Sequence, residues 1–279
     1  MTIHQASLKD IVELSVYSVA LANERNPVSL LLVAPPESGK TEIILAASDS
    51  PWTHTMTDVT GYGLIKSYLQ LLAKMEGQAP IPRLLLIPDL LQLSSRNRES
   101  SANVFAVLSA YIEEGVKRVH TYYTHADFSK PVCGGIVTAL TPGGFEDQRY
   151  IWHRSGFLSR FLVVTYSYSE LTQSIITEQI TAGEDAAASR IPIASGMPSQ
   201  LVDVVWKPTH MKILNLLLAD YLIAFKMKDN TYGFRLLKHL RRLAQASALR
   251  AGRQAVLRED IERVEYLVQL FGNYRFTEV

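Results

Sequence analysis

The sequence has very little cysteine and no excess of charge of either sign. Cys133 is the one cysteine in 279 residues, which excludes an intramolecular disulfide and a zinc site built from several cysteines. Lysine and arginine balance aspartate and glutamate to a formal charge of +1, so the chain lacks the global basic field of many non-specific nucleic-acid binders. We therefore expect a reduced, structural thiol, and any contact with nucleic acid has to be local.

Long apolar runs and targeting signals are also missing. No segment reaches the roughly 18 apolar residues that span a bilayer, and the start, MTIHQASLKDIVEL, has no basic region followed by an apolar one. The 7 histidines show no H-E-x-x-H or similar ligand spacing, so we expect no transition-metal site. These absences predict a soluble, cytoplasmic protein with no membrane partner.

The sequence does contain a regular alternation of apolar patterns. Apolar residues make up 47% of the chain and charged residues 20%, which is the composition of a folded globular protein. Short apolar runs alternate with segments of helical periodicity, and this is typical of a parallel sheet covered by helices. The expected strands cover residues 28–33, 83–89, 134–142 and 160–168, of which 160–168 is the last, and the expected helices cover 42–50, 63–75 and 100–115.

The later part of the chain has a different composition. Residues 180–200, ITAGEDAAASRIPIASGMPSQ, are small, polar and interrupted by proline and glycine, which indicates a surface linker. After residue 209 only helices are expected. We predict an α/β core over residues 1–180, a linker over 181–205 and a small all-α lid over 206–279.

Residues 30–42, LLLVAPPESGKTE, end like a phosphate-binding loop. The pattern G-x-x-x-x-G-K-[ST] between a strand and a helix aims backbone N–H groups and a lysine at phosphates, and it presents a hydroxyl to Mg²⁺. Ala34 replaces the leading glycine, but the strand–loop–helix context is present. The segment predicts an ATP·Mg²⁺ site, with Thr41 on the metal, that is formed by Pro36, Glu37, Ser38, Gly39, Lys40 and Thr41.

An acidic partner is expected at the end of a buried strand, and RLLLIPDLL places Asp89 there. The usual pair is Asp-Glu, whose first residue lies near Mg²⁺ and whose second polarises the attacking water. Asp89 either takes the metal position, with Leu90 replacing the glutamate, or takes the glutamate position, with Pro88 replacing the aspartate. It could also simply cap a turn, and Glu113 or Glu114 would then be the next acid to test.

Taken in order, several segments resemble an AAA+ ATPase, and within it the MCM-like (minichromosome maintenance helicase-like) branch. The resemblance runs from about Ser29 to Phe271. IVTALTPGG is similar to the strand of the first sensor, SGFLSRFLVV to the motif Leu-Leu-Ser-Arg-Phe-Asp, and TYGFRLLKHLRRLAQA to a lid helix with an arginine seven residues before an Arg-Leu pair. The resemblance implies an AAA+ core with a parallel sheet flanked by helices, followed by the all-α lid.

The same resemblance implies catalytic roles for individual side chains. Thr141 would be the first sensor, Arg160 the arginine finger that reaches a neighbour's nucleotide, and Arg235 the second sensor, with Arg242 further along the helix. Leu162 replaces the aspartate of the finger motif. Without the resemblance, Arg160 reads as a solvated charge at a strand start and Arg235 as a salt-bridging helix residue.

The candidate contact with DNA is the segment GVKRVHTYYTHADFSK. It begins within YIEEGVKRVH, which resembles a family helix that ends in acidic residues before a β-hairpin. Basic and aromatic residues alternate here, as in a hairpin that contacts backbone and bases. The alternative is an ordinary hairpin whose tyrosines, including Tyr123, pack on the core. The candidate residues are Lys117, Arg118, His120, Tyr122 and Lys130.

The resemblance implies a homo-oligomer, expected as a hexameric ring, that acts on DNA in replication together with other replication proteins, as a helicase or helicase loader does. Replicative MCM proteins carry a large N-terminal DNA-binding part, whereas the first strand here begins at Val28, so we do not expect a complete helicase. The alternatives are a protein-remodelling AAA+ ATPase and a nucleotide-binding scaffold with weak hydrolysis, the latter because Asp89 is a single carboxylate.

Overall fold

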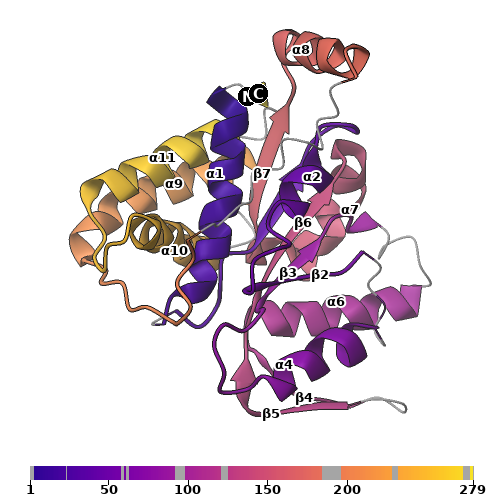
Figure 1. The fold of residues 1–279 in the computed structure, drawn as a ribbon, viewed down its shortest axis with the longest axis vertical. Helices are drawn as coiled ribbons and strands as arrows, with labels where there is room; N and C mark the ends of the chain where they lie inside the picture. The colour runs from indigo at the N-terminus through magenta and orange to yellow at the C-terminus, as the bar shows by residue number, and fades with distance from the viewer. Residues whose placement is uncertain are drawn as a thin grey trace.

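The computed structural model describes residues 3–22, 24–57, 60, 63–91, 98–120, 125–183, 196–227, 232–272 and 277–278. Its centre is a parallel sheet with helices on both faces (Figure 1). The strands of this sheet are β1 (Leu30–Val33), β2 (Thr53–Thr55), β3 (Leu84–Ile87), β6 (Gly135–Leu140), β7 (Leu162–Ser167) and β8 (Thr277–Glu278). Their order is β2-β3-β6-β1-β7-β8, and every neighbouring pair is parallel.

Helices precede, separate and follow the strands. Those in the first two thirds of the chain are α1 (Ile3–Tyr17), α2 (Lys40–Leu45), a π-helical segment at Leu64–Leu69, α4 (Gln70–Lys74), α6 (Arg98–Ile112), α7 (Pro142–Arg154) and α8 (Glu170–Thr181). Short 3₁₀ turns lie at Ser18–Ala20, Leu158–Arg160 and Pro208–His210. The C-terminal helices are α9 (Met211–Ala224), α10 (Phe234–Arg250) and α11 (Arg258–Phe271). Within the described residues, no helix is long and apolar enough to cross a bilayer.

The predicted α/β class and parallel sheet are confirmed. The four expected strands correspond to β1, β3, β6 and β7, and the first three of these strands are buried at every residue, because helices cover both faces of the sheet. The expectation that 160–168 is the last strand is wrong, since β8 pairs with Tyr166 and Ser167. A strand of two residues carries no periodic pattern that would reveal it.

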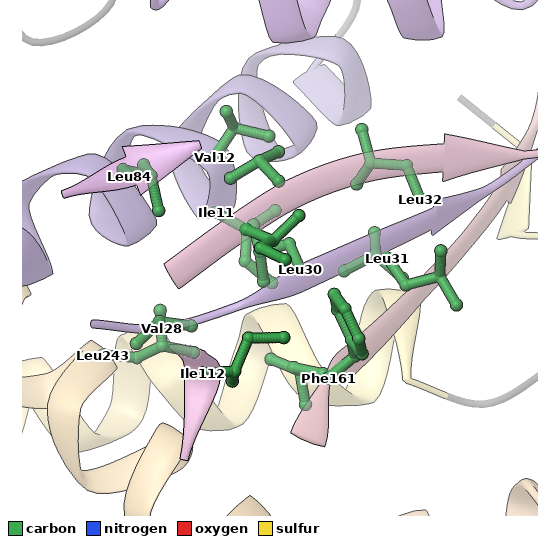
Figure 2. Packing of buried hydrophobic residues seen from close by; sticks show 14 of the residues in the cluster. Ile11, Val12, Val28, Leu30, Leu31, Leu32, Leu84, Ile112, Phe161 and Leu243 are labelled. Carbon is green, nitrogen blue, oxygen red and sulfur yellow. The ribbon is translucent and has the colours of Figure 1, made fainter. Parts of the chain in front are cut away.

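The C-terminal helices pack against both α1 and strand β7. Helix α1 lies between β7 and α9–α11 in Figure 1 and packs against α10, and Asp10 accepts a hydrogen bond from Arg263 at 2.8 Å. Figure 2 shows where the layers meet around β1. The boundaries 1–180, 181–205 and 206–279 stay a prediction, and residues 184–195 of the expected linker lie outside the described residues.

A buried charge cluster joins the chain before β1 to α10. Glu24, 6% exposed, accepts hydrogen bonds from Arg241 at 2.6 Å and from Arg242 at 3.0 Å. Arg242, the helix position that the sequence placed beyond Arg235, is therefore a buried structural residue. The guanidinium group of Arg242, 7% exposed, needs this carboxylate because an unpaired buried charge is costly, whereas Arg241 is 35% exposed.

We expect Glu24→Gln to lower the free energy of unfolding by about 3 kcal/mol, the usual cost of breaking a buried ion pair. Urea denaturation measures the change. The matched control is Glu262→Gln, which breaks the exposed pair with Arg258 on α11 and should cost about 0.5 kcal/mol or less. Equal effects of the two changes would contradict the structural role of Glu24.

The remaining strands form a separate antiparallel hairpin, β4 (Val116–His120) and β5 (His125–Val132), as the sequence predicted. It lies beside α4 and α6 in Figure 1. The chain passes from β5 directly into β6, so the base of the hairpin is at the amino-terminal edge of the parallel sheet.

Candidate nucleotide-binding site

The segment between β1 and α2 forms a loop at the carboxyl edge of the sheet. Ala34 is buried and extends β1, because its N–H donates to Leu140 O at 3.2 Å. Its φ is not positive, whereas Glu37 and Gly39 have φ of 60° and 73°. The left-handed conformation that favours glycine is thus required at Gly39 but not at Ala34, which explains how the loop forms without its leading glycine.

Lys40 begins α2 and turns its side chain into this loop. Its Nζ donates to Ala34 O at 2.8 Å, to Pro35 O at 2.5 Å and to Ser38 Oγ at 3.2 Å. Burial lowers the pKa of Lys40, and the nearby Asp89 carboxylate acts in the opposite direction. The ammonium group of Lys40 is therefore surrounded by oxygen atoms of the loop and lies near the Asp89 carboxylate.

Tyr166 of the neighbouring strand β7 and Tyr168, which follows that strand, contact the loop, and the sequence pattern did not identify them. Tyr166 Oη donates to Ser38 O at 3.1 Å. Tyr168 packs on Gly39, where an added Cβ would lie 2.6 Å from its hydroxyl. Their spacing was a signal in the sequence, because residues two apart in the expected strand 160–168 face the same side. The position of this strand beside β1 is visible only in the structure.

Asp89 and Thr141 reach the same edge from β3 and β6. Asp89 is half-buried, and its Oδ1 accepts a hydrogen bond from Leu91 N at 2.9 Å. Leu90 is fully buried, so the position after Asp89 offers no polar group to the loop. Thr141 follows the β6 residue that pairs with Val33, and its Oγ1 caps α7 by accepting from Gly144 N at 3.3 Å. The structure brings both residues beside the loop.

Arg160 and Arg235 lie together at the opposite, amino-terminal edge of the sheet. Arg160 ends a 3₁₀ turn two residues before Leu162, which pairs with the first residue of β1. Arg235 is the second residue of α10 and donates to Ser159 Oγ at 3.2 Å. Its Nε forms an ion pair with Glu113 at 2.8 Å, so this alternative acid is placed away from Lys40.

The guanidinium of Arg160 is half-buried and incompletely paired. Its Nη1 donates to Gly156 O, and its Nε has no hydrogen-bond partner among the described residues. Burial, followed by repulsion from Arg235, lowers its pKa. Its carbonyl accepts from His239 Nε2 of α10 at 2.8 Å, and burial lowers the pKa of His239 to about 3. Neutral His239 thus links α10 to the turn Leu158–Arg160 by a hydrogen bond.

The hairpin places its predicted DNA-contact residues in two different situations. Lys117 and Lys130 are exposed. Arg118 and His120 are exposed as well, but both contact Asp127, at 2.8 Å and 3.1 Å, so an acid partly offsets the charge of Arg118. Tyr122 and Tyr123 lie outside the described residues.

Comparison with known proteins supports the fold. No protein-family model and no curated protein matches the chain. Solved structures with a similar fold include the full-length MCM homolog from Methanopyrus kandleri, with a TM-score of 0.54 and 14% sequence identity. The match covers 100% of this chain and 57% of that chain. At this identity the likeness concerns the fold alone, and it agrees with the MCM-like arrangement expected from the sequence.

Proposed function

We propose that the protein is an ATPase whose active site is completed by a neighbouring copy of the chain, and that it acts on DNA. The observation that carries this proposal is the division of polar groups between the two edges of one sheet. Lys40 and Asp89 lie at the carboxyl edge, whereas Arg160 and Arg235 lie at the amino edge.

The length of the parallel strands keeps these groups apart within one subunit. Strand β1 spans four residues at about 3.3 Å each, and Arg160 precedes its beginning while the loop follows its end. An arginine that stabilises charge on the γ-phosphate has to approach that group closely. The finger must therefore come from another subunit, and head-to-tail contacts of this kind generate a ring or a helical filament.

The residues around the loop fit a nucleoside triphosphate with Mg²⁺. The side chain of Lys40 is half-buried and donates only to neutral oxygens, so a phosphate would give it an anionic partner. Thr41 and Asp89 would hold Mg²⁺, which takes oxygen ligands from few side chains and completes its shell with phosphates and waters. When bound, the metal would neutralise charge on the phosphates. Thr141 would contact the γ-phosphate, as a first sensor does in the proteins that the sequence resembles.

We expect Asp89→Asn to lower the rate of ATP hydrolysis about 100-fold or more while changing ATP affinity much less. An amide cannot replace a carboxylate as a metal partner or as a base. Steady-state turnover and fluorescent-nucleotide binding measure the two quantities, and Asp220→Asn on the exposed side of α9 is the control. Unchanged turnover would make Asp89 a structural residue and favour a scaffold with weak hydrolysis.

The hairpin is the element that we propose to contact DNA. Lys117 carries an exposed ammonium with no acidic partner among the described residues, unlike Arg118.

We expect single-stranded DNA binding to weaken with rising salt, and Lys117→Gln to reduce the slope of log K against log salt by about one. Fluorescence anisotropy measures the slope, and Lys212→Gln on α9 is the control. Affinity that does not depend on salt would favour a polypeptide substrate.

A further inference from the structure

A cavity with mostly apolar walls and three cationic side chains lies far from the phosphate-binding loop, at the base of the hairpin. Its volume is about 170 Å³. The chain contributes to it from the segment before β1, from residues directly before β2 and β3, from residues between 72 and 81, from the end of β5 with Cys133, and from Leu201. The residues that matter for its chemistry are Arg25, Arg83, Lys130, Cys133, Trp52 and Glu76.

Arg83 is the most unusual of these residues. Its Nη2 donates to Val19 O at 3.0 Å, and no carboxylate of the described residues forms an ion pair with it. Burial lowers the pKa of its guanidinium. A desolvated cation without an anion costs free energy, so this position favours an anionic ligand from outside the chain.

Two further cations line the same cavity, and its one acid is already engaged. Arg25 donates to Glu114 O, a neutral carbonyl, and lies beside the Cys133 thiol. Lys130 completes the lining from β5. The Glu76 carboxylate accepts hydrogen bonds from Ser129 N and Oγ at 3.0 Å and 2.6 Å, so it is directed at the strand. The lining therefore carries three cations and one carboxylate, and this carboxylate is already hydrogen-bonded to Ser129.

We propose that this cavity binds one phosphate group. Arginine suits phosphate because its planar fork donates parallel hydrogen bonds, and lysine adds a point charge. The volume is below the 300 Å³ or more that is usual for drug-sized ligands, so it fits a phosphate with a small attached group and not a whole nucleotide. The phosphate belongs either to a free phosphate ester or to the backbone of a nucleic-acid strand that passes the hairpin, and this second source rests on the proposed function.

The single cysteine provides a position-specific test. Cys133 lines the cavity, is 2% exposed and is the one thiol of the chain. Its slow alkylation by excess iodoacetamide, followed by mass spectrometry, therefore reports occupancy. The experiment uses the full chain with Lys40→Ala, which removes phosphate binding at the loop, and compares inorganic phosphate, glycerol phosphate and oligo(dT) with sodium chloride of equal ionic strength. A ligand at ten times its dissociation constant should slow alkylation about tenfold, because only the vacant cavity reacts.

Two variants assign the protection to the cavity. Arg83→Gln should abolish it, and Lys130→Gln, at an exposed position that preserves the fold, should weaken it several-fold. Lys212→Gln, at an exposed position on α9, is the matched control and should leave it unchanged. Protection by the free esters identifies a small-molecule site, and protection by oligo(dT) at strand concentrations where free esters have no effect identifies the nucleic-acid backbone. Protection by neither, or protection that survives both Arg83→Gln and Lys130→Gln, would overturn the proposal, whatever the fate of ATP binding at the loop.

Discussion

ATP binding is expected to weaken about 100-fold in Lys40→Ala, while the protein stays folded. The ammonium now donates to Ala34 O, Pro35 O and Ser38 Oγ and would donate to phosphate oxygens in the complex. Losing a hydrogen bond between charged groups costs about 3 kcal/mol, which corresponds to two orders of magnitude in affinity. The backbone of the loop would remain, since Tyr166 holds Ser38 independently of the lysine.

Isothermal titration calorimetry measures this affinity, and circular dichroism checks the fold. Lys212→Ala, which removes an exposed lysine of α9, should bind ATP as the unchanged protein does. Unchanged affinity in a folded Lys40→Ala protein would remove the loop from the proposed site and, with it, the ATPase proposal.

Arg160→Ala is expected to leave ATP binding by one subunit nearly unchanged but to lower the turnover of the assembly about 1000-fold. An arginine finger stabilises the charge that develops on the transferred phosphoryl group, and this is worth at least about three orders of magnitude in rate. The position of Arg160 at the amino edge of β7 leaves its own subunit's loop out of reach. Arg258→Ala, on an exposed turn of α11, is the control.

Mixing two inactive variants tests whether Arg160 acts across subunits. Arg160→Ala subunits keep an intact loop, and Lys40→Ala subunits keep an intact arginine, so a mixed assembly contains some interfaces with both. We expect turnover to reappear on mixing and to peak near equal amounts. An inactive mixture, in spite of co-assembly shown by native mass spectrometry, would be incompatible with action in trans.

The parts of the site that sequence reasoning could predict are those encoded by local patterns. The loop before Lys40 follows a short apolar run and precedes a helix, and Asp89 follows another such run, so both positions could be assigned without the fold. The arrangement of Arg160, Arg235 and Glu113 could not be derived in this way. These residues are separated along the chain, and the ion pair at 2.8 Å exists only because α10 packs beside the amino edge of the sheet.

The missed elements show the same limit. Helix α1 buries Leu8, Ile11 and Leu14 with at most 1% exposure, and the acids of its other face pair with Arg250 of α10 and Arg263 of α11. Its place in the fold therefore depends on helices that lie over 200 residues later in the chain. Strand β8 depends on pairing with β7, which lies over 100 residues earlier in the chain. The reason why the loop forms with Ala34 in place of glycine is also visible only in three dimensions. Ala34 continues β1 through its backbone hydrogen bond to Leu140 O.

Strand β7 has a mechanical consequence that follows from its two ends. At one end the chain carries Arg160, and at the other Tyr166 grips the loop of the same subunit. Hydrogen bonds to β1 and β8 on either side stiffen the strand, so its ends can shift only as one body. In the proposed ring, each β7 would lie between two consecutive nucleotides. One nucleotide would be bound by the loop of the same subunit, and the other, in the neighbouring subunit, would be contacted by Arg160. A shift of β7 at one nucleotide site would then move the arginine at the next site, so one strand per subunit would couple neighbouring sites around the ring.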